Sequence, residues 1–255
     1  MSELRFQIED GIGRIWVDRP QVLNALSREI IDDLDVLLDE IKDNKNVKVL
    51  IVGGEENFAA GADINGMVEC NPEEAKAFAF STTYDKLMNL PIPTIAAIDG
   101  YALGGGLEMT LACDIRIATE NAKMGLPELG IGIMPGAGGT IRLPRLVGYS
   151  KAFEIIALGR QVSAAEAEAI GLVNKVVKKE ALLDEARKWA NKFMQKAPIA
   201  LRVLKKTMQN GALILSPEEA IAYEAEQWAS LFSTEDQKEG MRAFVAKRRP
   251  QYHDK

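Results

Sequence analysis

Three consecutive glycines, Gly104–Gly106, follow an apolar stretch typical of a buried strand, and they restrict the folds open to this chain. Each glycine costs a regular strand or helix about 0.5–1 kcal/mol, so a run of them is expected where the backbone closely approaches another group. With a helix beginning at Leu107, the run would direct free amides toward a negative atom. Close packing of a helix on a sheet would explain the same residues. The run predicts a strand-to-helix junction of one of these two kinds.

Two glutamates stand in apolar or glycine-rich surroundings. Glu108 directly follows Leu107, and Glu128 follows Pro127, whereas the chain's single histidine, His253, lies next to its end. Acid–base chemistry in the middle of the chain must therefore use carboxyl groups. Burial raises the pKa of a carboxyl, and two acids that share a site titrate separately. We expect one of the two glutamates to hold a proton near neutral pH while the other stays ionised.

A second small-residue segment, Phe58–Ile64, follows the expected strand 48–52. Its backbone could present another amide near the glycine run. Two N–H groups that converge on a carbonyl oxygen form an oxyanion hole, and each contributes about 3–4 kcal/mol in the transition state. Taken alone, a short loop of alanines is also typical of plain packing.

Known phosphate-binding loops do not match this chain. A Walker loop closes with Gly-Lys-Ser/Thr, and no such tripeptide follows the glycine run. The segment 136–139 (GAGG) lacks the Gly-x-Gly-x-x-Gly spacing of dinucleotide-binding proteins and has no strand directly before it. Both nucleotide-binding interpretations are therefore rejected.

Charge and composition narrow the possible partners. The net charge of −6 argues against a general nucleic-acid binder, although the segment 247–249 (KRR) is locally basic. Two cysteines, Cys70 and Cys113, form no disulfide framework and are expected as thiols in a reducing compartment. Clustered metal ligands, a signal-like N-terminus and an apolar run of about 18 residues are not recognisable. We expect a cytoplasmic protein that binds neither metal nor membrane.

Strands and helices alternate in the first part of the chain, and helices dominate after about residue 140. A helix is expected after Ser27, with an apolar face from Ile30 to Ile41. The patterns predict strands at 4–9, 13–17, 48–52, 94–98 and 115–118, and further helices at 72–89, 149–159, 164–170, 179–195, 198–210, 217–232 and 235–248. This organisation predicts an α/β core at 1–195 and a helical region at 196–255.

Residues 57–68, 94–118 and 124–147 resemble the signature regions of the crotonase (enoyl-CoA hydratase/isomerase) superfamily. The resemblance extends from about residue 4 to residue 250. It is carried by four motifs in order: Ala60-Gly61-Ala62-Asp63, Gly104-Gly105-Gly106-Leu107-Glu108, Pro127-Glu128 and Pro135-Gly136.

The resemblance implies a spiral of repeated ββα units, with C-terminal helices that form a homotrimer or a hexamer built of two trimers. It implies an acyl thioester of coenzyme A as the ligand, so that coenzyme A belongs to the substrate and no separate cofactor is expected. The implied reaction is the reversible syn addition of water to a 2-enoyl-CoA. We add the hypothesis that the helical region, with Trp228, Phe232 and residues 235–248, covers the acyl end of the site.

The resemblance further assigns roles to individual residues of this chain. The amides of Ala62 and Gly105 correspond to the oxyanion hole, and Glu108 and Glu128 correspond to the acid–base pair of hydratases. Positions that contact the coenzyme or lie close to the reacting water are Ala60, Asp63, Ile64, Gly136 and Lys247, the last reaching a phosphate from a neighbouring subunit.

Departures from the commonest family pattern affect the substrate rather than the chemistry. Leu107, Leu126 and Ile141 replace a frequent cysteine and two frequent glutamines, so the acyl group is left open, with a branched or cyclic one among the alternatives. An enoyl-CoA delta-isomerase needs one carboxyl to move a proton between carbons, whereas this chain retains two. A binding protein on the same fold, including an RNA-binding one, would have no use for the acid pair.

Overall fold

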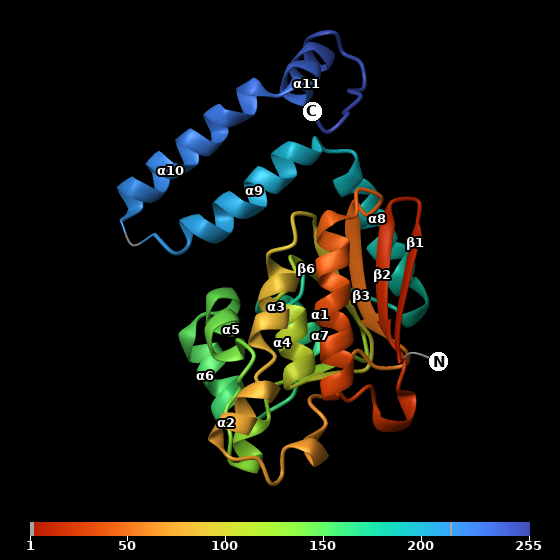
Figure 1. Cartoon of the computed structure of the whole chain (residues 1–255), viewed down its shortest axis with the longest axis vertical. Helices are drawn as coiled ribbons and strands as arrows, with labels where there is room; N and C mark the ends of the chain where they lie inside the picture. The colour runs from red at the N-terminus through yellow and green to blue at the C-terminus, as the bar shows by residue number, and fades with distance from the viewer. Residues whose placement is uncertain (1–2, 215) are drawn as a thin grey trace. The chain divides into compact units, whose positions relative to one another are not determined.

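The computed structural model describes residues 3–214 and 216–255, and the chain divides into two compact units (Figure 1). The first unit extends to Lys188, apart from Pro91–Pro93. The second unit consists of Pro91–Pro93 and Trp189–Lys255. Every residue predicted for the catalytic pair and the oxyanion hole belongs to the first unit.

The first unit is built on a six-stranded sheet in which the strand order is β1-β2-β3-β4-β6-β9. The pair β1/β2 is antiparallel, and the other neighbouring strands are parallel. The strands span, in that order, Leu4–Glu9, Ile12–Val17, Val49–Gly54, Thr94–Ile98, Ile115–Thr119 and Lys175–Val177. Both central strands, β3 and β4, are buried along their whole length, as expected for parallel strands covered on both faces.

A smaller sheet has the strand order β5-β7-β8. Its short strands are Tyr101–Leu103, Lys123–Gly125 and Val162–Ser163. Two successive strands followed by a helix recur along the chain, as in β1-β2-α1, β4-β5-α4 and β6-β7-α5. The α/β class and the repeated ββα units implied by the resemblance are therefore confirmed.

Helix α1, Arg28–Asp43, illustrates how the sequence pattern produces this packing. The hydroxyl of Ser27 accepts a hydrogen bond from the amide of Ile30 and caps the helix. The helix buries Ile30, Ile31, Leu34, Leu38 and Ile41, and it lies beside α3, Ser81–Met88 (Figure 1). The predicted helix is thus confirmed. The remaining helices of this unit are α2 (Pro72–Ala75), α4 (Gly105–Leu111), α5 (Gly139–Val147), α6 (Tyr149–Ala157), α7 (Ala164–Ala169) and the first part of α8 (Leu182–Met194).

The single helix expected over 72–89 is wrong. Asn71 caps α2 as predicted, but the chain passes through a 3-10 turn at Lys76–Phe78 and a left-handed residue, Phe80 (φ 53°), before α3 begins. This backbone is unfavourable for an aromatic residue, so tertiary packing must compensate. Phe80 is buried, and its ring meets that of Tyr84 edge-on at 6.2 Å. Burial of two aromatic rings has overridden local helix propensity.

The second unit is helical. Its helices are α9 (Pro198–Gly211), α10 (Pro217–Ser230) and α11 (Glu235–Val245), and α9 and α10 lie side by side. The last residues fold back on α11, where the buried carboxylate of Asp236 accepts hydrogen bonds from the amides of His253 and Asp254. Among the described helices, none has the length and apolar character needed to cross a membrane.

Candidate active site

The glycines of the run 104–106 are needed for different reasons, one for its backbone conformation and another for close packing. Strand β5 ends at Leu103, and Gly104 adopts φ 51° and ψ −128°, a region that L-residues with side chains avoid. A Cβ on Gly106 would lie 2.2 Å from the carbonyl oxygen of Ala59, so α4 packs directly against the loop after β3. Helix α4 therefore begins at Gly105, two residues earlier than expected. Close packing explains Gly106, and the helix start leaves the amide of Gly105 free.

Glu108 lies on α4 and is 3% exposed. Its Oε1 accepts two hydrogen bonds of 2.8 Å, from the amides of Ala137 and Gly139 in the loop that leads into α5. Burial raises the pKa of Glu108, while the two amides and the positive charge of Arg142 oppose that increase. The carboxyl is thus fixed in position, with donors that favour its ionised form.

Glu128 begins the 3-10 turn η4, Glu128–Ile131, and its side chain reaches the start of α4. A Cβ on Gly104 would lie 3.2 Å from its Oε1. Burial raises the pKa of Glu128 to about 7, and the negative charge of Glu108 adds to the shift. Its Oε2 is buried and has no hydrogen-bond partner within the described part of the chain. A buried polar atom without a partner is costly and is commonly found where a ligand binds.

Two backbone amides meet beside this pair of acids. A Cβ on Gly105 would lie 3.8 Å from the amide nitrogen of Ala62. Neither the Ala62 nor the Gly105 N–H donates a hydrogen bond to any of residues 3–214 or 216–255. The structure therefore brings together the four residues Ala62, Gly105, Glu108 and Glu128. Paired free amides are the geometry that stabilises a developing oxyanion.

The loop that carries Ala62 is held by backbone pairing with Leu26. The amide of Leu26 donates to Gly61 at 2.8 Å, and the amide of Asp63 donates to Leu26 at 2.9 Å. Together these two bonds fix the peptide that bears the Ala62 N–H.

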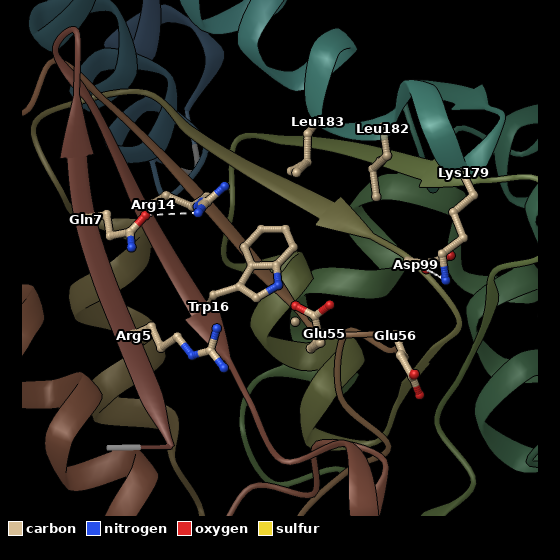
Figure 2. Close-up of a pocket in the computed structure, with 11 residues that line it drawn as sticks. Arg5, Gln7, Arg14, Trp16, Glu55, Glu56, Asp99, Lys179, Leu182 and Leu183 are labelled. Atoms are coloured by element: carbon tan, nitrogen blue, oxygen red, sulfur yellow. Dashed lines mark hydrogen bonds and ion pairs between the residues drawn. The ribbon is translucent and has the colours of Figure 1, made fainter. Parts of the chain in front are cut away.

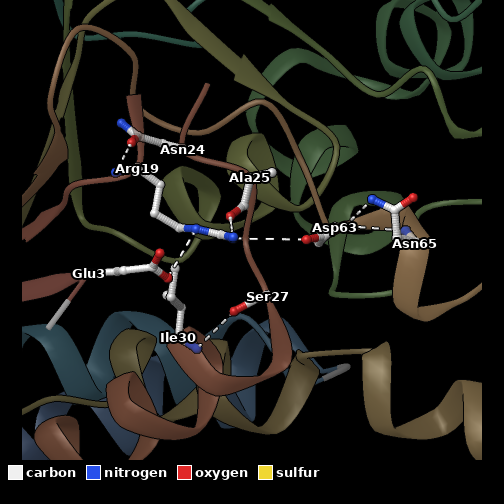
Figure 3. A network of polar contacts seen from close by, with 8 residues as sticks. All are labelled: Glu3, Arg19, Asn24, Ala25, Ser27, Ile30, Asp63 and Asn65. Atoms are coloured by element: carbon white, nitrogen blue, oxygen red, sulfur yellow. Dashed lines mark hydrogen bonds and ion pairs between the residues drawn. The ribbon is translucent and has the colours of Figure 1, made fainter. Parts of the chain in front are cut away.

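The side chain of Arg19 also contacts the loop that carries Ala62 (Figure 3). Its Nη1 donates to the carbonyl of Ala25 at 2.8 Å and lies 4.0 Å from Oδ2 of Asp63. The Asp63 carboxylate also accepts a hydrogen bond from the amide of Asn65. Arg19 and Asp63 were not recognisable as partners from the sequence, because the contact joins distant segments.

The remaining predicted residues occupy more open positions. Ala60 donates its amide to Leu23 at 3.0 Å, and the side chain of Ile64 is 51% exposed. Gly136 is exposed, and apart from its chain neighbours the described residues would place only the Cα of Ala79 within 4 Å of a Cβ added there. Lys247 belongs to the second unit, where it is exposed with φ 51°. Their contacts with a coenzyme stay predictions.

Sequence reasoning missed two residues that contact the site. Tyr84 is fully buried, and Arg142 reaches the loop that binds Glu108. The sequence around Tyr84 and Arg142 gives little indication of a role in the site, because each residue meets its partner only when the chain is folded.

A cavity of about 250 Å³ lies elsewhere in the first unit. Arg14 and Trp16 point into it from β2, and Lys179 approaches from the opposite side (Figure 2). Lys179 pairs with Asp99 at 2.8 Å, and the guanidinium of Arg14 lies 5.5 Å from the Trp16 ring centroid. None of the predicted site residues lines this cavity, and its cations already have partners.

A model of the family described as enoyl-CoA hydratase/isomerase matches residues 7–255 of this chain. The chain belongs to the enoyl-CoA hydratase/isomerase family. Membership confirms the resemblance read from the four motifs, and it confirms the fold that the resemblance implied.

Individual members of the family match almost the whole chain. A short-chain-enoyl-CoA hydratase of Clostridium acetobutylicum is 42% identical over 253 residues, which cover 98% of this chain and 97% of the relative. A crotonyl-CoA hydratase of Syntrophomonas wolfei is 40% identical over 251 residues, 97% of this chain and 96% of the relative. The crystal structure of an enoyl-CoA hydratase from Bacillus anthracis matches with a TM-score of 0.95, 38% identity and complete coverage of both chains.

Proposed function

We propose that this chain is an enoyl-CoA hydratase, a hydro-lyase that reversibly adds water across the 2,3 double bond of a 2-enoyl-CoA to give a 3-hydroxyacyl-CoA. One observation carries the proposal: a buried carboxyl group, Glu108, and a half-buried one, Glu128, stand beside two unpaired backbone amides. The similarity to proteins named short-chain-enoyl-CoA hydratase and crotonyl-CoA hydratase supports the same reaction.

In this mechanism the amides of Ala62 and Gly105 bind the thioester oxygen. Their hydrogen bonds withdraw electron density and make the β-carbon electrophilic. As water adds, negative charge moves onto the thioester oxygen, and the two donors stabilise it without having to reorient.

The two glutamates divide the proton transfers. Glu108, whose Oε1 already accepts two amide hydrogen bonds, takes a proton from water while the water oxygen bonds to the β-carbon. Glu128, with a pKa raised to about 7, retains a proton for part of the population at neutral pH and delivers it to the α-carbon. In dehydration the same steps run in reverse. Holding water between two fixed carboxyls also removes orientational entropy from the barrier.

The remaining assignments complete the substrate complex. We infer that Ala60, Asp63 and Ile64 contact the adenine end of the coenzyme, that Gly136 lies close to the reacting water, and that Lys247 binds a phosphate from a neighbouring subunit. Coenzyme A enters as part of the substrate, and we propose that the protein works in the cytoplasm without a separate cofactor.

We further propose assembly as a homotrimer or as a hexamer of two trimers through the helical region. Large apolar side chains that are more than half exposed in the second unit are consistent with an interface; they are Leu204, Met208, Leu213, Ile221, Trp228, Met241, Phe244 and Val245.

Hydration of crotonyl-CoA tests the proposal directly. The purified chain is expected to remove the enoyl absorbance of crotonyl-CoA and to form 3-hydroxybutyryl-CoA. Unchanged crotonyl-CoA together with conversion of a 3-enoyl-CoA to its 2-enoyl isomer would instead assign a delta-isomerase. A panel of straight, branched and cyclic enoyl-CoA thioesters would then define the acyl group by kcat/KM.

A further inference from the structure

Arg142 connects two parts of the first unit through one nearly buried side chain, which is 11% exposed. From helix α5, its Nη1 donates a 2.7 Å hydrogen bond to the carbonyl oxygen of Ala137. Its Nη2 forms an ion pair with Asp85 on α3. An arginine held at both prongs of its planar fork has little freedom to move.

The turn that Arg142 holds, residues 137–139, is the one that binds Glu108. Ala137 presents its carbonyl to Arg142 and its amide to Oε1 of Glu108, and Gly139 adds a second amide to the same oxygen. Between them, Gly138 turns the chain at φ 103°, and a Cβ there would lie 2.1 Å from Nη1 of Arg142. The guanidinium therefore lies against the turn itself.

We propose that Arg142 is a positioning residue for hydration, which fixes the 137–139 turn so that its amides and its own positive charge keep Glu108 oriented and ionised. This inference rests on the proposed function. It adds a residue that acts through Glu108 and contacts no substrate.

The effect of Arg142 on the pKa of Glu108 can be measured, because the charged and titratable groups around Glu108 are known. Tyr84 from α3 and Glu128 from η4 both interact electrostatically with the Glu108 carboxyl, and α4 supplies no second charged side chain. Arg142 is the cation that lowers the pKa of Glu108. Its removal leaves burial opposed only by the amides of Ala137 and Gly139, so that pKa should rise further. The low-pH limb of kcat/KM, where the general base becomes protonated, should move to higher pH.

The test compares Arg142→Gln with Arg145→Gln, the same substitution at an exposed position of the same helix. Arg142→Gln is expected to lower kcat about 10- to 100-fold with KM changed less than about 3-fold, the scale of a displaced catalytic group. Its low-pH limb should move up by about one pH unit, the usual effect of losing a nearby opposite charge. Arg145→Gln should match the wild-type protein in both respects.

Arg142→Lys separates charge from geometry, and it carries the test if the glutamine variant does not fold. Lysine keeps the positive charge but lacks the two donor groups of the guanidinium. The value of kcat should therefore fall at least about 5-fold, while the low-pH limb of kcat/KM moves by less than about 0.3 pH unit. The inference would be overturned by a folded Arg142→Gln variant whose low-pH limb of kcat/KM does not move, or by an Arg142→Lys variant with wild-type kcat. Absence of hydration by the wild-type chain would instead reject the proposed function.

Discussion

The hydroxyl of Tyr84 donates a 2.9 Å hydrogen bond to the carbonyl oxygen of Gly105 from a fully buried position. This bond ties α3 to the first residue of α4, whose amide is one of the two free donors of the site. Burial, together with the negative charge of Glu108, raises the pKa of Tyr84 well above its usual value, so the phenol stays a donor throughout the working pH range.

Tyr84→Phe should therefore loosen the Gly105 peptide. The carbonyl keeps its place in the hydrogen bonding of α4 but loses its second donor, and the free energy of unfolding is expected to fall by about 0.5–1.5 kcal/mol. Turnover of crotonyl-CoA should fall several-fold because the Gly105 amide is less well oriented. Urea unfolding and steady-state kinetics measure the two effects. A variant as stable and as active as the wild type would contradict this role of the bond.

The acid pair is tested by Glu108→Gln and Glu128→Gln, which preserve side-chain size. Each should lower kcat by at least about 10²-fold, the scale of general acid–base catalysis. Glu120→Gln, at an exposed position just after β6, serves as the matched control and should retain full activity. A loss of 10-fold or less at either site residue would remove it from the proposed mechanism.

Glu128 should also make stability depend on pH. Its pKa rises from 4.5 to about 7 on folding, so the folded chain binds more protons in this range. The free energy of unfolding must therefore decrease as pH rises through this window. Glu128→Gln removes the charge of this half-buried carboxyl and should raise the free energy of unfolding near pH 8 by about 1–2 kcal/mol, with solvent screening taken into account.

Near pH 4, where the carboxyl is protonated in both states, the same variant should differ little from the wild type. Urea titrations at the two pH values make the comparison. If Glu128→Gln instead lowers the free energy of unfolding by the same amount at both pH values, ionisation of the Glu128 carboxyl does not destabilise the folded chain, and the prediction is wrong.

A pair of glycine substitutions tests the packing of α4. Gly106→Ala places a Cβ against the carbonyl of Ala59, and the overpacking should cost about 1–3 kcal/mol of the free energy of unfolding. Gly211→Ala, at the end of α9, meets none of the described residues outside its own stretch of helix within 4 Å and should stabilise the chain by up to about 1 kcal/mol. Opposite changes in the denaturation midpoint are expected. A neutral Gly106→Ala would mean that the α4 junction tolerates a side chain.

Assembly is tested at α11, where Phe244 is 85% exposed and Val245 is 81% exposed. Phe244→Asp should place a charge in the proposed interface and convert trimers to monomers in sedimentation experiments. Deleting 235–255 should remove assembly and activity together. If the deletion variant stays trimeric and active, the predicted role of this region in both assembly and covering the acyl end is wrong.

The sequence was informative about the acids because their immediate neighbours predict their burial. Glycine, leucine and methionine beside Glu108, and leucine and proline beside Glu128, pointed to a raised pKa, and the structure gives that direction for both. Strand 94–98 followed from a short continuous apolar run and the helix after Ser27 from its apolar periodicity, and both were confirmed.

Other features depend on contacts that no local pattern encodes. Arg142 and Tyr84 meet the site only because α3, α4 and α5 converge there, and the left-handed turn at Phe80 exists because two rings pack together. The strands β5, β7 and β8 are two or three residues long, too short for an alternating pattern to predict.

The segment Pro91–Pro93 has a consequence for protein engineering. It groups with the helical unit although it stands between α3 and β4, and Lys205 of α9 donates a 3.0 Å hydrogen bond to the carbonyl of Ile92. The helical unit is therefore formed by two separate segments of the chain. A chimera that exchanges helical regions between relatives needs two splice sites, and one that replaces the C-terminal sequence alone would leave the new helices against a foreign proline turn.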